Sequence, residues 1–87
     1  MKLNVTFTIN AWNQMTEVIQ TDKRMAKQVI KLIDDTVRNP FSGLGKPEPL
    51  KMELQGFWSK RVDKKNRMVY HVTPEAIEII AIKGHYE

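Results

Sequence analysis

The chain has 87 residues, of which 41% are hydrophobic and 28% charged, with no cysteine, a net charge of +4 and a pI near 9.5. This length predicts one domain over residues 1–87, and the lack of cysteine excludes disulfides, thiolate nucleophiles and Cys-type metal sites. Two isolated histidines argue against a structural metal site, no apolar run approaches the roughly 20 residues of a membrane span, and the first residues lack a secretion signal. We therefore expect a cytoplasmic protein without metal or other cofactor and without membrane contact.

The first half of the chain predicts one strand and two helices. Residues 3–9 alternate between apolar and polar side chains, which is typical of a strand with one buried face. Apolar residues then recur at helical spacing over residues 11–19, with Asn10 as the expected N-cap. Thr21-Asp22 interrupts this helix and caps a second, amphipathic helix over about residues 23–38.

The second half predicts a loop followed by strands. Residues 41–49 form the only long irregular segment, and their glycines and prolines are typical of a functional loop. After this segment, apolar and polar residues again alternate with a period of two. The last expected strand is apolar on both faces, which predicts an interior position in the sheet. The expected strands cover about residues 50–54, 58–63, 67–72 and 76–83. The sequence thus predicts an α+β fold, with two N-terminal helices packed on one face of a mostly antiparallel, twisted sheet of four to five strands.

Glu48 is a carboxylate placed between Pro47 and Pro49, with Lys46 and Lys51 close by. The prolines restrict the backbone to an extended conformation, and such a stiff segment can aim a side chain. Taken alone, the segment favours a plain connection between elements with an exposed glutamate.

Arg67 begins a strand whose alternation assigns faces. Met68 and Tyr70 belong on the helix-covered side, which leaves Arg67 on the other face, where Lys60 joins it if the strand registers agree. The alternative for Arg67 is a solvated arginine or an ion pair with Asp63. Seven basic residues lie between positions 46 and 67, against three acidic ones.

His85 follows the last predicted strand without a break, so it extends from a rigid element. Glu48, Arg67 and His85 together supply a carboxylate base, a fixed cation and a proton donor. Cleavage of RNA by its own 2′-OH needs these three groups and no metal.

The lysines beside Glu48 attract a phosphate backbone, but they favour the charged carboxylate and so make it a poor acceptor for a hydroxyl proton. Orientation of the reacting groups can supply about 7–11 kcal/mol of barrier lowering. We therefore expect another component to present the RNA in a reactive geometry.

Several segments resemble the YoeB/Txe toxins of bacterial type II toxin–antitoxin systems, within the RelE superfamily. The resemblance is carried by residues 43–51, 56–61 and 66–70 and by the closing His85-Tyr86. It implies a ribosome-dependent endoribonuclease that cleaves mRNA in the A site of the 70S ribosome, with a YefM-type antitoxin as partner and a homodimer as one assembly state. It also implies Glu48 as general base, Arg67 as phosphate stabiliser, His85 as general acid and Tyr86 as an aid to substrate orientation. The positions implied to contact RNA or the ribosome are Lys46, Lys51, Lys60, Arg61, Lys64 and Lys65.

The chain departs from the family pattern at three places. Glu87 follows the His-Tyr pair that ends many relatives, Lys60 replaces the first arginine of a common Ser-Arg-Arg, and Gly84 replaces a larger residue. Two other functions stay open, namely a non-enzymatic gyrase inhibitor similar to ParE toxins and a plain basic RNA-binding module.

Overall fold

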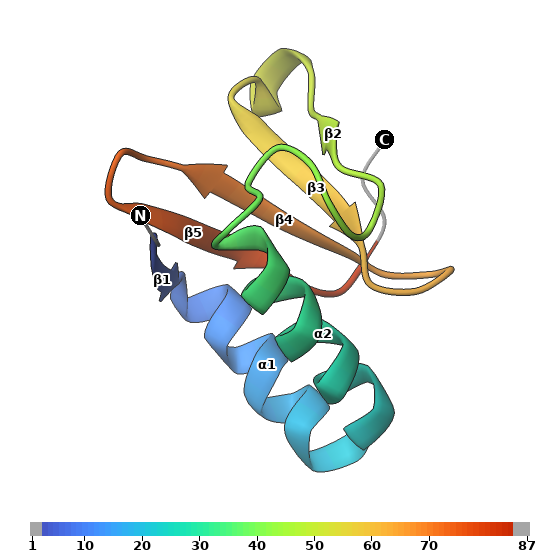
Figure 1. The fold of residues 1–87 in the computed structure, drawn as a ribbon. Coiled ribbons are helices and arrows are strands. Elements are labelled where there is room, and N and C mark those ends of the chain that lie inside the picture. Colours follow the sequence, from blue (N-terminus) through green and yellow to red (C-terminus); the bar gives the residue numbers. More distant parts are fainter. Residues whose placement is uncertain (1–2, 85–87) are drawn as a thin grey trace.

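A computed structural model describes residues 3–84 and shows two helices packed against a five-stranded mixed sheet (Figure 1). The helices are α1 (Ile9–Thr21) and α2 (Lys23–Thr36), and the strands are β1 (Asn4–Phe7), β2 (Glu48–Pro49), β3 (Phe57–Arg61), β4 (Arg67–Val72) and β5 (Ala76–Ala81). The strand order is β1-β5-β4-β3-β2, in which β1 runs parallel to β5 and all other pairs are antiparallel. The predicted α+β fold is confirmed, and so is the interior position of the last strand.

The two helices begin at side-chain caps. Asp22 caps α2, because its Oδ1 accepts from the Met25 amide at 3.0 Å, as predicted. The predicted cap of α1 at Asn10 is wrong, since Thr8 offers the same chemistry two residues earlier and its hydroxyl accepts from the Ala11 amide at 3.1 Å. Asn10 instead donates from Nδ2 to the Ile80 carbonyl at 3.3 Å.

The strand predicted over residues 50–54 is wrong. Only Glu48–Pro49 pair with β3, and Met52–Leu54 form a short 3-10 helix, η1. Pro49 is tolerated because β2 lies at the sheet edge, where a missing N–H costs no ladder bond. Met52 has a φ of 58°, and this left-handed conformation turns the chain out of its extended path.

The apolar residues form two clusters, one on each face of the sheet. The larger lies between the helices and the sheet and contains the fully buried Val29, Met68, Tyr70, Ile77 and Ile79. The smaller lies on the helix-free face, where Leu50, Val69 and Ala81 are buried against Leu54, Phe57 and Ile80. The segment from β2 to η1 therefore covers part of this second face and places Glu48 beside it.

Within residues 3–84, neither the length nor the apolar character of any helix suffices for crossing a membrane.

Candidate functional site

Three neighbouring strands bring Glu48, Ser59 and Arg67 together on the helix-free face. Glu48 of β2 pairs with Ser59 of β3, and directly opposite residues of antiparallel strands point to the same face. The guanidinium of Arg67 on β4 donates from Nη1 to the Ser59 hydroxyl oxygen at 3.4 Å. Ser59 is fully buried, pairs with Glu48 through the strand register and contacts Arg67 through its hydroxyl. Sequence reasoning missed Ser59. The available signal is strand alternation, because Ser59 lies two residues before Arg61 in β3 and so shares its face.

Arg67 lies on the face predicted for it, and only 9% of it is exposed. No carboxylate within residues 3–84 forms an ion pair with it. The alternative partner, Asp63, is engaged in the β3–β4 turn, where its Oδ1 accepts from the amides of Lys65 at 2.8 Å and Asn66 at 2.7 Å. Because a poorly hydrated cation without a paired acid is energetically costly, such a residue is typical of an anion site.

Next to Arg67 the surface forms a hollow of about 180 Å³, lined by Arg61, Asp63, Lys64 and Arg67. Arg61 pairs with Arg67 in the sheet register, so both side chains share the helix-free face. Three of the four lining residues are cationic at neutral pH. The hollow therefore has the charge and the donors that a phosphate group requires.

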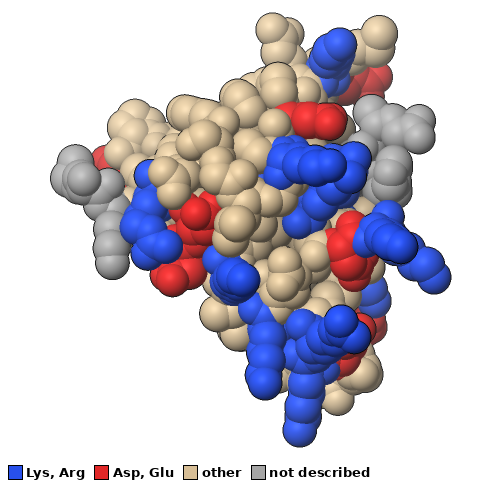
Figure 2. Space-filling model, turned by 45° about the vertical axis from the view of Figure 1, so that its right-hand side comes forward, with Lys and Arg blue, Asp and Glu red and all other residues tan. Residues whose placement is uncertain are grey.

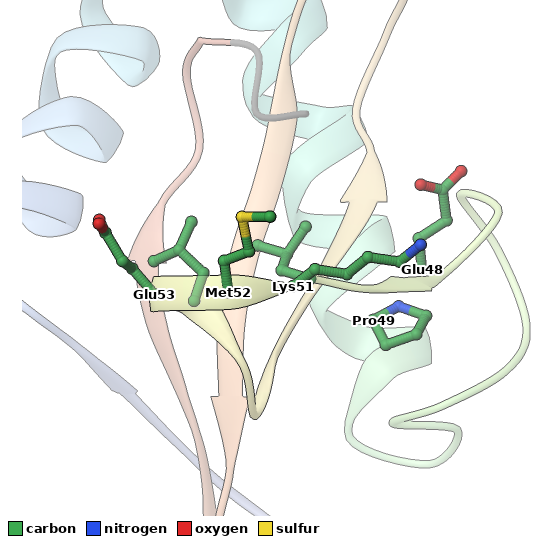
Figure 3. A pocket seen from close by; sticks show the side chains of 7 residues that line it. Glu48, Pro49, Lys51, Met52 and Glu53 are labelled. Carbon is green, nitrogen blue, oxygen red and sulfur yellow. The ribbon is translucent and has the colours of Figure 1, made fainter.

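Glu48 is exposed at one end of an open groove of about 650 Å³ that residues 48–54 line (Figure 3). Glu48 and Pro49 leave the strand on opposite sides, and the Lys51 side chain extends along the strand toward the Glu48 end (Figure 3). No hydrogen bond or ion pair from a residue in the described part of the chain reaches the Glu48 carboxylate. Its position is therefore set by its own backbone and by the loop that precedes it.

The expectation that Lys60 joins Arg67 on an open face is wrong. Lys60 pairs with Met68, lies on the helix-covered side and is 0% exposed. Its ammonium donates to Asp35 Oδ2 at 3.3 Å and to the Asn39 carbonyl at 3.0 Å. Burial lowers the pKa of Lys60, and the nearby Asp35 carboxylate opposes that shift. This burial removes Lys60 from the set of RNA contacts, and Arg61 takes the expected place beside Arg67.

The other basic candidates all lie at the surface, as RNA or ribosome contacts require. Figure 2 shows basic side chains in several groups spread across this face, with acidic side chains between them. The exposed candidates are Lys46, Lys51, Arg61, Lys64 and Lys65.

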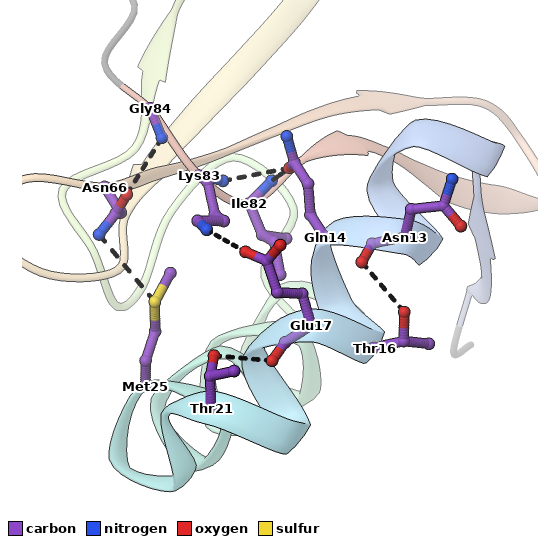
Figure 4. A network of polar contacts seen from close by, with 10 residues as sticks. All are labelled: Asn13, Gln14, Thr16, Glu17, Thr21, Met25, Asn66, Ile82, Lys83 and Gly84. Atoms are coloured by element: carbon purple, nitrogen blue, oxygen red, sulfur yellow. Dashed lines mark hydrogen bonds and ion pairs between the residues drawn. The ribbon is translucent and has the colours of Figure 1, made fainter.

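His85 and Tyr86 lie outside the described residues, but the segment that leads to them is well held (Figure 4). The Gly84 carbonyl accepts from the Arg67 amide at 3.0 Å, and the Gly84 amide donates to Asn66 Oδ1 at 3.1 Å. On the other side, Gln14 Oε1 of α1 accepts from the amides of Ile82 at 2.8 Å and Lys83 at 3.3 Å. These contacts fix residues 82–84 next to Arg67.

Comparison with known proteins identifies the family. The family described as "YoeB-like toxin of bacterial type II toxin-antitoxin system" has a sequence model that matches residues 7–86. Toxin YoeB of Escherichia coli K12 is 47% identical over 76 residues, which cover 87% of this chain and 90% of the relative. A solved YoeB/ParE toxin from Agrobacterium tumefaciens superposes with a TM-score of 0.93 at 37% identity, covering 97% of this chain and 100% of that one.

Solved structures from Staphylococcus aureus show the same relationship. A YoeB dimer superposes with a TM-score of 0.91 at 38% identity, and a YoeB–YefM complex with 0.89 at 37%, each covering 99% of this chain and 100% of the other. The protein described here is therefore a member of the YoeB-like toxins of bacterial type II toxin–antitoxin systems.

Proposed function

We propose that this toxin is a ribosome-dependent endoribonuclease that cleaves mRNA in the A site without a metal and so inhibits translation. The observation that best supports this function is the placement of Glu48 and Arg67 around Ser59 on one face of the sheet. A base and a cation on the same face of neighbouring strands suit attack of a 2′-OH on the neighbouring phosphate.

The proposed reaction assigns one role to each group. Glu48 takes the proton of the 2′-OH, whose oxygen attacks the phosphorus, while Arg67 stabilises the charge on the pentavalent phosphate. His85 protonates the departing 5′-oxygen, so that a 2′,3′-cyclic phosphate and a free 5′-OH result, and Tyr86 orients the substrate. The position of Gly84 next to Arg67 supports the assignment of His85, the residue that follows it.

The open groove around Glu48 supports dependence on the ribosome. The carboxylate is exposed and close in sequence to Lys46 and Lys51, and residues 3–84 form no enclosed cavity there that could hold an RNA in line. The ribosome supplies that orientation. The exposed residues Lys46, Lys51, Arg61, Lys64 and Lys65 contact RNA or the ribosome, and the protein acts in the cytoplasm.

The S. aureus relatives support two protein partners. One structure holds a YoeB dimer and another a YoeB–YefM complex. We infer that this chain binds a YefM-type antitoxin and forms a homodimer. An acidic antitoxin segment that folds on binding would complement the basic face and cover the site.

Translation in a cell-free extract tests the function. Wild-type toxin should arrest translation and leave a cut in the mRNA, while Glu48→Ala, Arg67→Ala and His85→Ala should each lower the cleavage rate by about 100-fold or more. Glu75→Ala removes an exposed carboxylate from the β4–β5 turn and should retain full activity.

Full arrest by all three variants would contradict the proposed site. Unchanged translation with inhibited gyrase supercoiling would instead support a ParE-like inhibitor. Salt-sensitive RNA binding without a broken phosphodiester would support a plain binding module.

A further inference from the structure

Lys60 is a fully buried cation that the proposed reaction does not use. It extends from β3 toward the C-terminal part of α2, where its ammonium nitrogen lies 3.3 Å from Asp35 Oδ2. The Asp35 side chain is 14% exposed. The same ammonium donates to the Asn39 carbonyl at 3.0 Å. Lys60 therefore joins three parts of the fold, namely β3, α2 and the start of the loop that leads to Glu48.

Asp35 continues these contacts into the loop. Its Oδ2 accepts from the Leu44 amide at 2.9 Å, and its Oδ1 accepts from Asn39 Nδ2 at 3.2 Å. Tyr70 of β4 adds a further tie, because its hydroxyl donates to the Pro40 carbonyl at 2.6 Å. Asp35, Asn39, Lys60 and Tyr70 are together called the loop latch below.

Three consecutive residues of β3 hold the loop at three points. Ser59 pairs with Glu48, Lys60 binds the start of the loop through Asn39, and the Arg61 amide donates to the Gly45 carbonyl at 2.6 Å. A displacement of the loop start relative to β3 therefore acts directly on the segment that ends at Glu48. By contrast, β2 itself has only two residues, so its own pairing contributes little to fixing the position of Glu48.

We propose that the loop latch positions Glu48 for proton transfer, with Lys60 and Asp35 as positioning residues. This inference rests on the proposed function of Glu48 as the base. The carboxylate has no side-chain partner within residues 3–84, so among the described residues only the backbone of β2 and of the loop places its Cα and Cβ. A shift of about 1 Å in such a group can lower a rate by up to about 100-fold.

A purely structural role makes a different prediction. Replacing both partners of a buried ion pair by apolar side chains is often neutral, whereas removing one partner costs stability when the other is left uncompensated. In Lys60→Met the Asp35 carboxylate keeps its hydrogen bonds from Leu44 and Asn39. Met is close to Lys in length and lacks the charge, so Lys60→Met removes both polar contacts with little change in packing. If Lys60 only fills the core, this variant should keep the wild-type rate.

The experiment measures the loop and the reaction separately. Hydrogen exchange on the free toxin follows the amides of Leu44 and Arg61, which report the two loop contacts. Single-turnover cleavage on mRNA-programmed ribosomes gives the rate at saturating toxin and the half-saturating concentration. Lys60→Arg tests rescue by a conservative change, and Lys27→Met removes an exposed lysine of α2 as the matched control.

In Lys60→Met we expect the Leu44 amide to exchange faster and the saturating cleavage rate to fall by about 10–100-fold, with an unchanged half-saturating concentration. Lys60→Arg keeps the positive charge and the hydrogen-bond donors at this position and should recover most of the rate. Lys27→Met should behave as wild type in both measurements.

The outcomes separate the latch from the function. A wild-type rate in Lys60→Met, or a loss confined to the half-saturating concentration, would overturn the positioning role. Unchanged exchange at Leu44 would overturn the latch itself, even if the wild-type toxin cleaved no mRNA and the proposed function failed. If Lys60→Met does not fold, Asp35→Asn weakens the same contacts and should give the same pattern, and a wild-type rate in it would overturn the proposal.

Discussion

Arg67 combines burial, a cationic charge and a neutral partner. Its Nη1 contacts the Ser59 hydroxyl, and its backbone amide binds Gly84, so the side chain and the main chain are both fixed. A planar guanidinium fixed in this way can offer two parallel donors to a phosphate. The residue is therefore suited to recognise the shape of the phosphate group as well as its charge.

Arg67→Lys should keep the positive charge and lose the two parallel donors of the planar guanidinium. We expect cleavage to fall by about 100-fold, the cost of one lost transition-state donor, while stability changes little. Primer extension on mRNA from programmed ribosomes measures the cut. Arg38→Lys, an exposed change whose partner Asp34 lies at 3.8 Å, is the control. Equal cleavage by Arg67→Lys and wild type would show that charge alone suffices.

At the level of single residues, the sequence predicted some side-chain positions and missed others. The extended backbone at Glu48 and the face of Arg67 follow from proline geometry and strand alternation, which are local. The position of Lys60 does not follow from such local rules. It depends on the β3–β4 register, which the Asp63 turn fixes by placing Arg61 opposite Arg67.

Among the elements, the loop from α2 to β2 depends on close packing at Gly45. Gly45 has a φ of 82°, and a Cβ there would lie 2.9 Å from Leu32 Cδ1, 2.9 Å from Lys60 Cβ and 3.0 Å from the Arg61 carbonyl oxygen. The loop thus approaches β3 more closely than any side chain at this position allows.

Gly45→Ala should lower the free energy of unfolding by about 2–4 kcal/mol, from a left-handed φ together with steric overlap. Gly56→Ala separates the two causes, because its φ is 94° but no atom of residues 3–84, apart from Gly56 and its two chain neighbours, lies within 4 Å of the added Cβ. It should cost only about 1–2 kcal/mol. Urea unfolding of both variants measures the difference, and equal losses would show that packing at Gly45 contributes nothing.

The elements also show where periodicity fails as a predictor. The helices and the strands β3, β4 and β5 were predicted because their apolar faces meet a core. The segment after Glu48 shows the same period of two, yet it forms η1 because Met52 adopts a positive φ. Leu50 and Leu54 of this segment pack in the small cluster with Val69, a tertiary contact that no local pattern encodes.

For the whole molecule, acid stability should depend on Asp35. The hydrogen bond from the Leu44 amide, with help from Asn39 and Lys60, lowers the pKa of this carboxyl below its ordinary 3.8, although burial raises it. Because the folded pKa is below the unfolded one, the carboxylate stabilises the fold above the unfolded pKa, and this contribution is lost as the pH falls through the folded value.

Asp35→Asn should therefore flatten the decline of the free energy of unfolding below about pH 4, when denaturant unfolding is followed from pH 7 to pH 2.5. Asp34→Asn, at a neighbouring exposed carboxylate, should leave the decline unchanged, since surface pairs contribute little. A decline in Asp35→Asn as steep as that of wild type would assign the acid sensitivity to other groups.

The parallel pairing of β1 with β5 joins the first strand of the chain to the last. Residues 4 and 76 are partners, and Gln14 of α1 binds the amides of residues 82 and 83. Among the described strands, β1 therefore lacks its sheet partner until β5 has been synthesised. Under the proposed function, a nascent chain that has not yet reached β5 lacks the completed sheet and should not cleave mRNA.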